Sequence, residues 1–528
     1  MDIKELRKKF DSAQTEKYKF KTLYEDVYKY GMPDRYSNIQ YNKEGYVGQK
    51  NMDEVYSSAM QESCEGFVQR TQGLLFPVNM DWIDLEAGFL FDTKQNESKK
   101  DAVNKELSKM AQLLNTYKNI SNFDMEATKF CYELIAGTAV LLVKEGTFDN
   151  PLSFTSIPFS DITIVDGVDG KADTFFRTLK VKNKLIEHTW KGAKWSYEEN
   201  EADKLVDLIE ATYYDYDKKV WNYVVFDSNA EKIAYENKTK TSPFVDLRWG
   251  KLSNETYGRG QGLKVIADFK MLNKIKKYSI ECLAFTIPAF TATEDCDFAN
   301  LEVNGGAVNP VRANENSNPP IRKIDVGDMK TDLQQYNMVQ LEMNVRRGLL
   351  ATSIPNDPNR KMTATEVAER IQELDNTLAN TFGAFVDFQY RLIQRIVEVL
   401  QTFGYIDPQN FDVKSFNGFN YRIKVNTQLA NQQANEEVQK TLQAIGLLAQ
   451  LDPTMQFTTK VIDMNKMVPY LLEKMGVRKD FIRGEDEIIA LQQQEAEAMA
   501  EQQQQAMIDD VAVANAKEMG KANAGENI

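Results

Sequence analysis

The feature that most constrains the fold is one long amphipathic run in the second half of the chain. Apolar residues recur every three or four positions from Val367 to Phe403, and Gly404 ends the run. Thr363 and Glu366 stand before it in the spacing of a capping box. About 40 helical residues at about 1.5 Å each predict a helix of roughly 60 Å, with Gly383 as a candidate bend. A helix of that length needs support along its flank, and neighbouring copies of the chain are one candidate support.

The remaining sequence predicts an α+β fold that is mainly helical. Helical spacing is seen in four segments of the first 135 residues, and short β-branched and aromatic runs between residues 138 and 247 predict a strand-rich module. Helical periodicity returns at Gly262–Phe285, where Val265, Phe269, Leu272, Ile280 and Leu283 form one apolar stripe. Other predictions are a helix at 10–30, a helix at 54–75, a strand at 82–85, helices at 102–114, 124–135 and 328–350, a strand at 419–426, and helices at 435–450, 453–467 and 468–476.

Composition limits the class of protein. The chain is 42% hydrophobic and 27% charged, which is typical of a folded protein, and it has no apolar run long enough to span a membrane. Its charged amino terminus does not resemble a signal peptide, so we expect synthesis in the cytoplasm. Four well-separated cysteines predict buried thiols in a reducing compartment.

The net charge of -14 argues against a protein that coats nucleic acid with a basic surface. It does not argue against one that lets DNA pass without binding it tightly.

No motif in the sequence predicts catalysis, a cofactor or a metal site. The single histidine, His188, is expected to be a partly exposed strand residue, and one histidine without partners makes neither a catalytic triad nor a zinc site. The glycines of Tyr257–Gly262 lack the spacing of a phosphate-binding loop, and we expect them to permit a tight approach into the following helix.

Acidic pairs leave one alternative open. Asp215 with Asp217, and Glu294 with Asp295 and Asp297, are the carboxylates that a magnesium-dependent nuclease would need. Such pairs are also common on the surface of an acidic protein, which is the interpretation we favour.

Four blocks of sequence carry a resemblance to a known family. They are LLFPVNMDWIDLE at 74–86, YGRGQGLKVIADFKMLNKIKK at 257–277, KMTATEVAERIQEL at 361–374 and NTQLANQQANEEVQ at 426–439. Together they resemble the portal proteins of short-tailed bacteriophages, also called head-to-tail connecting proteins. The resemblance extends from about residue 10 to about residue 475, and the second and third blocks are specific in combination.

The resemblance implies a portal-type ring subunit with a wing, paired stem helices, a clip, a long kinked helix and a helical crown. The implied divisions are a wing at 1–260 containing the strand-rich module, a first stem helix at 262–285, a clip at 286–325, a second stem helix at 326–350, a tunnel loop at 351–362, a long wing helix at 363–404, a wing strand region at 405–426, a crown at 427–483 and an acidic glutamine-rich tail at 484–528, either helical or disordered.

The resemblance also implies a function and partners. Such proteins form a ring, of twelve subunits in this family, at one vertex of the capsid. The ring conducts double-stranded DNA during packaging by a terminase motor, retains and releases the genome, and carries the tail. The implied partners are copies of the same chain, DNA, the terminase, the major capsid protein, scaffold or internal core proteins and a tail adaptor, with no membrane, and assembly takes place in the host cytoplasm.

Within this arrangement the cations of the stem helices become candidates for contact with DNA in the channel. They are Lys270, Lys274, Lys277, Arg346 and Arg347. The three lysines are expected on the helix face opposite the apolar stripe, where they either face DNA or pair with carboxylates of an adjacent stem helix, such as Asp328, Asp332 or Glu342. The tunnel loop is expected to project towards DNA through Ser353, Ile354, Pro355, Asn356, Asp357, Pro358, Asn359, Arg360 and Lys361.

Two rival functions stay open at this point. One is a different ring of the virion, such as a tail adaptor, for which we expect a much shorter chain. The other is the magnesium-dependent nuclease, which cleavage of DNA with and without EDTA would reveal.

Overall fold

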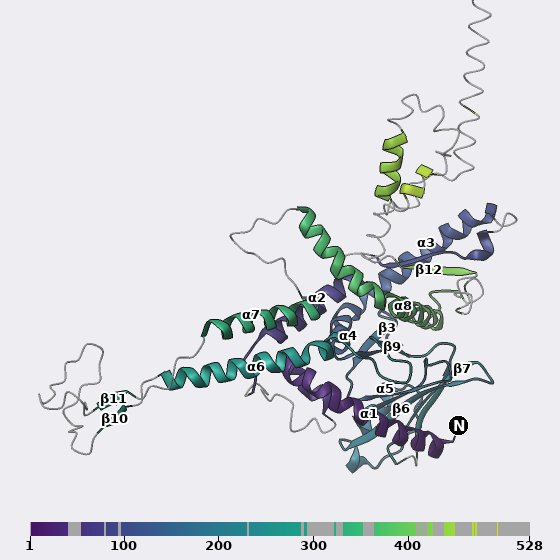
Figure 1. Cartoon of the computed structure of the whole chain (residues 1–528). Helices are drawn as coiled ribbons and strands as arrows, with labels where there is room; N and C mark the ends of the chain where they lie inside the picture. The colour runs from purple at the N-terminus through teal and green to yellow at the C-terminus, as the bar shows by residue number, and fades with distance from the viewer. Residues whose placement is uncertain are drawn as a thin grey trace, which may run out of the picture. The chain divides into compact units, whose positions relative to one another are not determined.

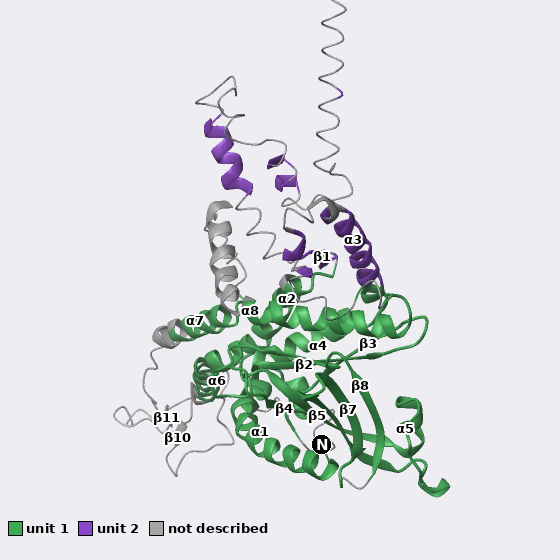
Figure 2. Cartoon of the chain, turned by 90° about the vertical axis from the view of Figure 1, so that its right-hand side faces the viewer, with its two compact units in different colours: residues 1–78, 117–413 green, residues 79–116, 414–528 purple. Residues whose placement is uncertain are grey.

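The computed structural model describes most of the chain up to residue 407 and short segments after it. The described residues are 2–40, 54–78, 81–92, 97–229, 232–286, 290–292, 321–323, 331–351, 364–407, 411, 413, 420–425, 438–448, 467–468, 470–472 and 494 (Figure 1). They fall into two compact units (Figure 2). Unit 1 is formed by residues 1–78 and 117–413, and unit 2 by residues 79–116 and 414–528.

Helix α1 (Ile3–Gly31) opens unit 1. The Asp2 side chain accepts a hydrogen bond from the Ile3 N–H at 2.7 Å, and Glu5 completes a capping box with it. This cap explains why the helix begins seven residues before the predicted start at Phe10. Leu6 and Phe10 are buried in the same cluster as Phe176 and Phe226 of the following β-rich region, so the first helix and the strands share one core.

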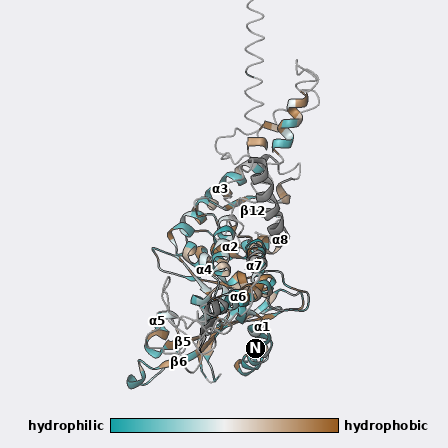
Figure 3. Ribbon diagram, turned by 60° about the vertical axis from the view of Figure 1, so that its left-hand side comes forward, coloured by the Kyte–Doolittle hydropathy of each residue, from teal (hydrophilic) through white to brown (hydrophobic). Residues whose placement is uncertain are grey.

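Of the other helices that the structure describes in unit 1, the five longer ones keep the predicted order with shifted ends, and the three short ones were not predicted. Hydrophilic and hydrophobic segments alternate along the helices, as expected where one face is buried (Figure 3). These elements are η1 (Pro33–Ile39), α2 (Ala59–Leu75), α4 (Phe123–Ala136), α5 (Asn183–Thr189), η3 (Glu199–Glu201), α6 (Gln261–Thr286), α7 (Thr331–Gly348) and α8 (Ala364–Thr402).

Two antiparallel sheets form the β-rich region of unit 1. One has the order β3-β2-β9 and the other the order β4-β5-β6-β7-β8, in which each strand pairs with the next along the chain. The turn between β4 and β5 uses Gly170 at a φ of +69°, a left-handed conformation that glycine adopts readily. The strands are β2 (Thr138–Glu145), β3 (Leu152–Ile157), β4 (Ile162–Asp166), β5 (Ala172–Lys182), β6 (Leu205–Asp215), β7 (Val220–Asp227), β8 (Ile233–Thr239) and β9 (Phe244–Arg248).

One local prediction in this region is wrong. His188 lies near the end of helix α5, exposed to solvent, and not in a strand. Asn183 and Ile186 are buried while the residues between them are exposed, which is a helical and not an alternating pattern.

The segment Tyr257–Gly262 passes through a tight crossing that places α6. The Gly258 N–H donates to Thr138 Oγ1 at 2.8 Å, and its carbonyl accepts a hydrogen bond from the Tyr24 hydroxyl. A Cβ on Gly258 would meet the carbonyl oxygen of Gly137, and that of Trp249 at 2.6 Å. The predicted role of these glycines in a close approach is therefore confirmed.

Helix α8 confirms the long amphipathic run. It extends unbroken over 39 residues, and Gly404 follows it at a φ of +77°. Phe385 and Phe388 pack with Phe76 of the α2 end, at ring-centroid distances of 5.6 and 6.0 Å. Thr363 of the predicted capping box lies outside the described residues.

Strand pairing organises unit 2. Strand β1 (Ile83–Ala87) pairs antiparallel with β12 (Tyr421–Val425), with Leu85 opposite Ile423, as the two predicted strands allow. The unit also holds η2 (Phe89–Asp92), most of α3 (Glu97–Ile120) and helical residues at 438–448.

Two further expectations concern the burial of the cysteines and the presence of membrane-spanning helices. Cys64 and Cys131 are free and fully buried, and burial raises the pKa of the Cys131 thiol to about 12. Of the helices in the described part of the chain, none has both the length and the apolar character needed to cross a membrane.

Candidate nucleic-acid interface

Helices α6 and α7 lie side by side and antiparallel, and they carry the five cations singled out in the sequence (Figure 1). Val265, Phe269 and Leu272 are buried, as the predicted stripe requires. Ile280 is wrongly placed in that stripe: it is 54% exposed. The helical period alone gives no information on where the neighbouring elements end, and the side chain of Leu283 lies outside the described residues.

Two contacts hold the pair together. Gly348 of α7 lies directly against the Val265 side chain, where a Cβ would collide with it. Lys276 Nζ lies 2.6 Å from Glu342 Oε1 and 3.1 Å from Ser57 Oγ. Glu342, one of the carboxylates predicted to pair with Lys270, Lys274 or Lys277, is thus held by Lys276 of its own chain.

The three candidate lysines are exposed, as predicted, but their surroundings differ. Lys270 forms an ion pair with Asp26 of α1. Lys277 lies 3.9 Å from Glu281 and its ammonium stands over the Tyr56 ring. Lys274 stands over the Tyr278 ring, 5.8 Å from its centroid, and no carboxylate of the described residues pairs with it.

The two arginines of α7 also differ. Arg346 Nη2 lies 3.0 Å from Glu62 Oε2 of α2. Arg347 is exposed, and within the described ranges no carboxylate pairs with it. Two of the five cations, Lys270 and Arg346, therefore attach the α6–α7 pair to α1 and α2, and Lys274 and Arg347 have charges that these contacts do not neutralise.

Further attachments were not predicted from the sequence. Asn273 of α6 accepts a hydrogen bond from the Tyr56 N–H at 2.7 Å and donates one to the Glu54 carbonyl at 2.7 Å. Glu54 in turn lies 2.5 Å from Lys29 Nζ, and this bond raises the pKa of Lys29. The one available signal was the position of Asn273, a polar residue on the buried side of the helix.

Several predicted divisions fall largely outside the described residues. The tunnel loop from Ser353 to Lys361 lies outside them. Of the clip, the structure describes two short antiparallel strands, β10 (Phe290–Ala292) and β11 (Ile321–Lys323). Residues Glu294, Asp295 and Asp297 lie outside, and so does the acidic tail except for residue 494.

Charged groups in the β-rich region have structural partners. Glu210 is fully buried between Lys144 and Arg177, and it accepts a hydrogen bond from the Tyr223 hydroxyl at 2.6 Å. Burial alone would raise the pKa of Glu210, but the two cations outweigh it and hold the pKa below its usual value.

A second buried carboxylate joins the sheet to α8. Asp246 lies 2.8 Å from Arg248 and 2.5 Å from Arg391 of α8. Although burial opposes ionisation, Arg391 and Arg248 lower the pKa of Asp246 to about 2. The carboxylate is therefore ionised at neutral pH and holds the helix against strand β9.

Of the acidic residues that suggested a metal site, Asp215 stabilises a turn. Asp215 Oδ1 accepts hydrogen bonds at 3.1 Å from the N–H groups of both Asp217 and Lys218. Within the part of the chain that the structure describes, no three His, Cys, Asp or Glu side chains gather as metal ligands would.

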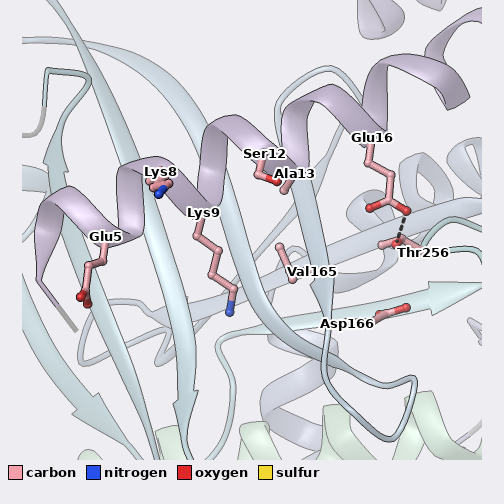
Figure 4. A pocket seen from close by; sticks show the side chains of 9 residues that line it. All are labelled: Glu5, Lys8, Lys9, Ser12, Ala13, Glu16, Val165, Asp166 and Thr256. Atoms are coloured by element: carbon pink, nitrogen blue, oxygen red, sulfur yellow. Dashed lines mark hydrogen bonds between the residues drawn. The ribbon is translucent and has the colours of Figure 1, made fainter.

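A shallow hollow of about 500 Å³ lies between α1 and the end of β4 (Figure 4). Thr256 donates a hydrogen bond to Glu16 at 3.1 Å across it, and Asp166 lies 2.5 Å from Lys251. Its lining carries both signs of charge, so it does not form a basic site for phosphate.

Comparison with known proteins gives a clear result at the level of the family. The family model described as "Bacteriophage head to tail connecting protein" matches residues 3–482. No curated protein matches the chain.

Solved structures resemble the chain at low identity. One is from the virion of a native gene transfer agent particle, with 10% identity, coverage of 74% of this chain and 89% of that chain, and a TM-score of 0.33. Another is from the neck of the native particle computed with C12 symmetry, with 9% identity, coverage of 74% and 87%, and a TM-score of 0.30. A third, from the neck of the empty particle computed with C6 symmetry, has 10% identity, coverage of 74% and 88%, and a TM-score of 0.33.

Proposed function

Because the chain belongs to the family of bacteriophage head-to-tail connecting proteins, we propose that it is the portal subunit of its phage and forms a closed ring around DNA. Its place is the virion, at the junction of head and tail. The match over residues 3–482 is the observation that carries the proposal, since it includes both helices of the α6–α7 pair and all of α8.

The ring is proposed to have twelve subunits and to act as a passive conduit. A separate terminase drives DNA through it during packaging, and the ring then retains the genome and later releases it into the tail. Its proposed protein partners are the terminase, the major capsid protein, scaffold or core proteins and a tail adaptor. The divisions into wing, stem, clip, tunnel loop and crown stand as part of this proposal.

The charges of the α6–α7 pair support a conduit with few phosphate contacts. An overall charge of -14 disfavours tight binding of DNA, and a small number of cations positions the backbone. We assign that role to Lys274 and Arg347, because Lys270 and Arg346 are neutralised by Asp26 and Glu62. The tunnel-loop residues Arg360 and Lys361 are proposed to add to it.

Electron microscopy of the purified protein tests the proposal. We expect closed rings with a central hole wide enough for duplex DNA, and no hydrolysis of ATP or magnesium-dependent cleavage of DNA by the rings. Isolated monomers, or cleavage that EDTA abolishes and that persists through repeated purification, would contradict it.

A further inference from the structure

Four aromatic rings from three segments of unit 1 gather where α8 ends. The ring of Tyr405 is at their centre, and its centroid lies 4.8 Å from that of Tyr117, 5.9 Å from that of Phe148 and 6.4 Å from that of Phe403. Tyr117 belongs to the last turn of α3, Phe148 to the turn between β2 and β3, and the other two follow α8. We name these four residues the aromatic cluster.

Backbone hydrogen bonds fix Tyr405 at the centre of the cluster. Gly404 has a φ of +77°, and the N–H groups of Gly404 and Tyr405 donate to the carbonyls of Gln401 and Leu400, both at 3.0 Å. This is a Schellman motif, in which a glycine reverses the chain at the end of a helix. The Tyr405 hydroxyl also donates to the Phe148 carbonyl at 2.8 Å, so it joins the end of α8 to the β2–β3 turn.

Phe148 is held in solvent at the tip of that turn. The Thr147 N–H donates to the Asn150 carbonyl at 2.9 Å, and the Gly146 N–H donates to the Pro151 carbonyl at 2.9 Å. The exposed fraction of Phe148 is 72%. Turns usually carry Gly, Pro, Asn, Asp or Ser, and a phenylalanine as exposed as this one buries little apolar surface on folding. Its ring therefore adds little to the stability of the chain.

The charges beside the aromatic cluster are negative. Glu145 and Asp149 are exposed at the β2–β3 turn, and Asp407 is exposed two residues after Tyr405. Within three residues of a cluster member along the described chain, the one cation is Lys118, whose side chain is buried. Desolvation raises the pKa of Tyr405 and the charge of Asp149 adds to this effect, so the Asp149 carboxylate lies close enough to act on the cluster.

We propose that the aromatic cluster and its acidic rim bind a basic peptide segment of another protein, with an arginine or lysine side chain stacked on the Phe148 ring. The face of an aromatic ring attracts a cation, and the carboxylates of Asp149 and Glu145 attract it further. An exposed apolar patch with a polar rim is typical of an interaction site. The site is separate from the α6–α7 pair, so it goes beyond the proposed DNA conduit and does not depend on it.

Charge decides between the possible occupants of the site. The acidic rim repels the phosphates of nucleic acid. It also disfavours the carboxyl-terminal segment of the chain itself, since residues 484–528 include ten acidic residues and two lysines. A neutral apolar or proline-rich segment would cover the rings but leave the carboxylates without partners. A basic segment satisfies both the rings and the carboxylates.

Fluorescence anisotropy of labelled peptides with the full-length chain tests the site. The probe is a peptide of alternating arginine and glycine. The comparison peptide has citrulline in place of arginine, which keeps nearly the same shape and removes the charge. We expect the citrulline peptide to bind at least about tenfold more weakly than the arginine peptide, because it loses both the cation–π contact and the attraction to the carboxylates.

Substitutions at the turn distinguish recognition of a cation from plain apolar contact. Phe148→Leu keeps an apolar side chain without a ring and should weaken binding of the arginine peptide at least about fivefold, whereas Phe148→Trp should retain it, because tryptophan attracts cations best. Asp149→Asn should weaken binding about twofold at low salt and less at high salt. Thermal unfolding should be unchanged in all three variants, since both side chains are exposed.

Tyr18→Ala is the matched control. Tyr18 is an aromatic residue of α1 with an exposed fraction of 59%, and its loss should leave peptide binding unchanged. The overall charge of -14 attracts any basic peptide weakly, so only differences between variants report on the site. Equal affinities of the unmodified chain, Phe148→Leu and Phe148→Trp for the arginine peptide, or equal affinities of the unmodified chain for both peptides, would overturn the proposal, whether or not the chain forms rings.

Discussion

The β-rich region and the α6–α7 pair differ in how completely the chain buries their side chains. In the β-rich region even charged groups are enclosed by the same chain: Glu210 is fully buried between Lys144 and Arg177, with Tyr223 beside it. On the α6–α7 pair, by contrast, large apolar side chains are between 49% and 57% exposed, namely Met271, Tyr278, Ile280, Val339 and Met343. The first region encloses its charges within one chain, whereas the second leaves large apolar side chains in solvent, which is typical of a surface that binds another molecule.

The largest expected effect comes from placing charges on the exposed apolar side chains of the α6–α7 pair. Met271→Glu with Met343→Glu puts two charges on exposed apolar side chains of the α6–α7 pair, and an unpaired carboxylate is costly where a neighbouring subunit of the proposed ring buries it. We expect rings to be lost while the thermal unfolding of the single chain is unchanged, because both side chains are already exposed in it. Size-exclusion chromatography and calorimetry measure the two effects.

Met125→Glu is the matched control for that variant. Met125 lies on α4 with an exposed fraction of 61%, but not on the α6–α7 pair. It should leave rings intact. If both variants assemble equally well, the exposed apolar side chains of the pair are ordinary surface.

The next effect concerns the tight crossing that joins the two regions. Gly258→Ala forces a Cβ against the carbonyl oxygens of Gly137 and Trp249, and we expect it to reduce the free energy of unfolding by about 3 kcal/mol. Gly73→Ala on α2, where no atom lies within 4 Å of the new Cβ, should instead stabilise by about 0.5–1 kcal/mol. Urea unfolding measures both, and equal midpoints would show that the crossing is not under steric constraint.

A smaller effect tests how completely the β-rich region encloses its charges. The pKa of Asp246 is lowered from 3.8 to about 2 in the folded chain, so its ionised form adds stability above pH 4 that is lost as the pH falls towards 2. We expect Asp246→Asn to reduce the loss of unfolding free energy between pH 4 and pH 2 by about 2 kcal/mol.

Asp203 provides the exposed comparison for that measurement. It pairs with Lys182 and Lys184 in solvent, where water screens the interaction, so Asp203→Asn should alter the acid dependence much less. Urea unfolding at pH values from 5 to about 2.5 measures, for each variant, the slope of the free energy of unfolding against pH. Identical slopes for the two variants would contradict the buried role of Asp246.

The smallest expected effect on stability comes from removing cations of the α6–α7 pair, and it distinguishes Lys270 from Lys274 and Arg347 by their roles. Lys270→Gln removes an exposed ion pair with Asp26 worth about 0–1 kcal/mol and should leave retention of packaged DNA unchanged. Lys274→Gln with Arg347→Gln should retain DNA less well, most clearly at low salt, where phosphate contacts are strongest. The DNA content of virions carrying each variant measures this, and equal retention would remove Lys274 and Arg347 as DNA contacts.

Elements with strong periodicity were predictable from the sequence. The long helix ending at Gly404 and the strand Tyr421–Val425 were both found, because an apolar period reports directly which face is buried. The close approach at Gly258 was also predicted, since glycine is required where two backbones nearly touch.

Contacts between distant segments were not predictable in the same way. The spacing of Lys270 gave the face on which it lies, but not that Asp26, 244 residues away, would neutralise it. Ile280 fits the helical stripe and is still exposed, because exposure depends on where the neighbouring elements end. Sequence periodicity predicts a surface, and only the tertiary arrangement shows what covers it.

Sedimentation of the full-length chain over a range of concentrations tests the central claim most directly. A closed ring predicts one discrete species, present at micromolar concentration, whose mass does not grow as more protein is added. A stable monomer at micromolar concentration, or polymers that lengthen with concentration, would contradict it.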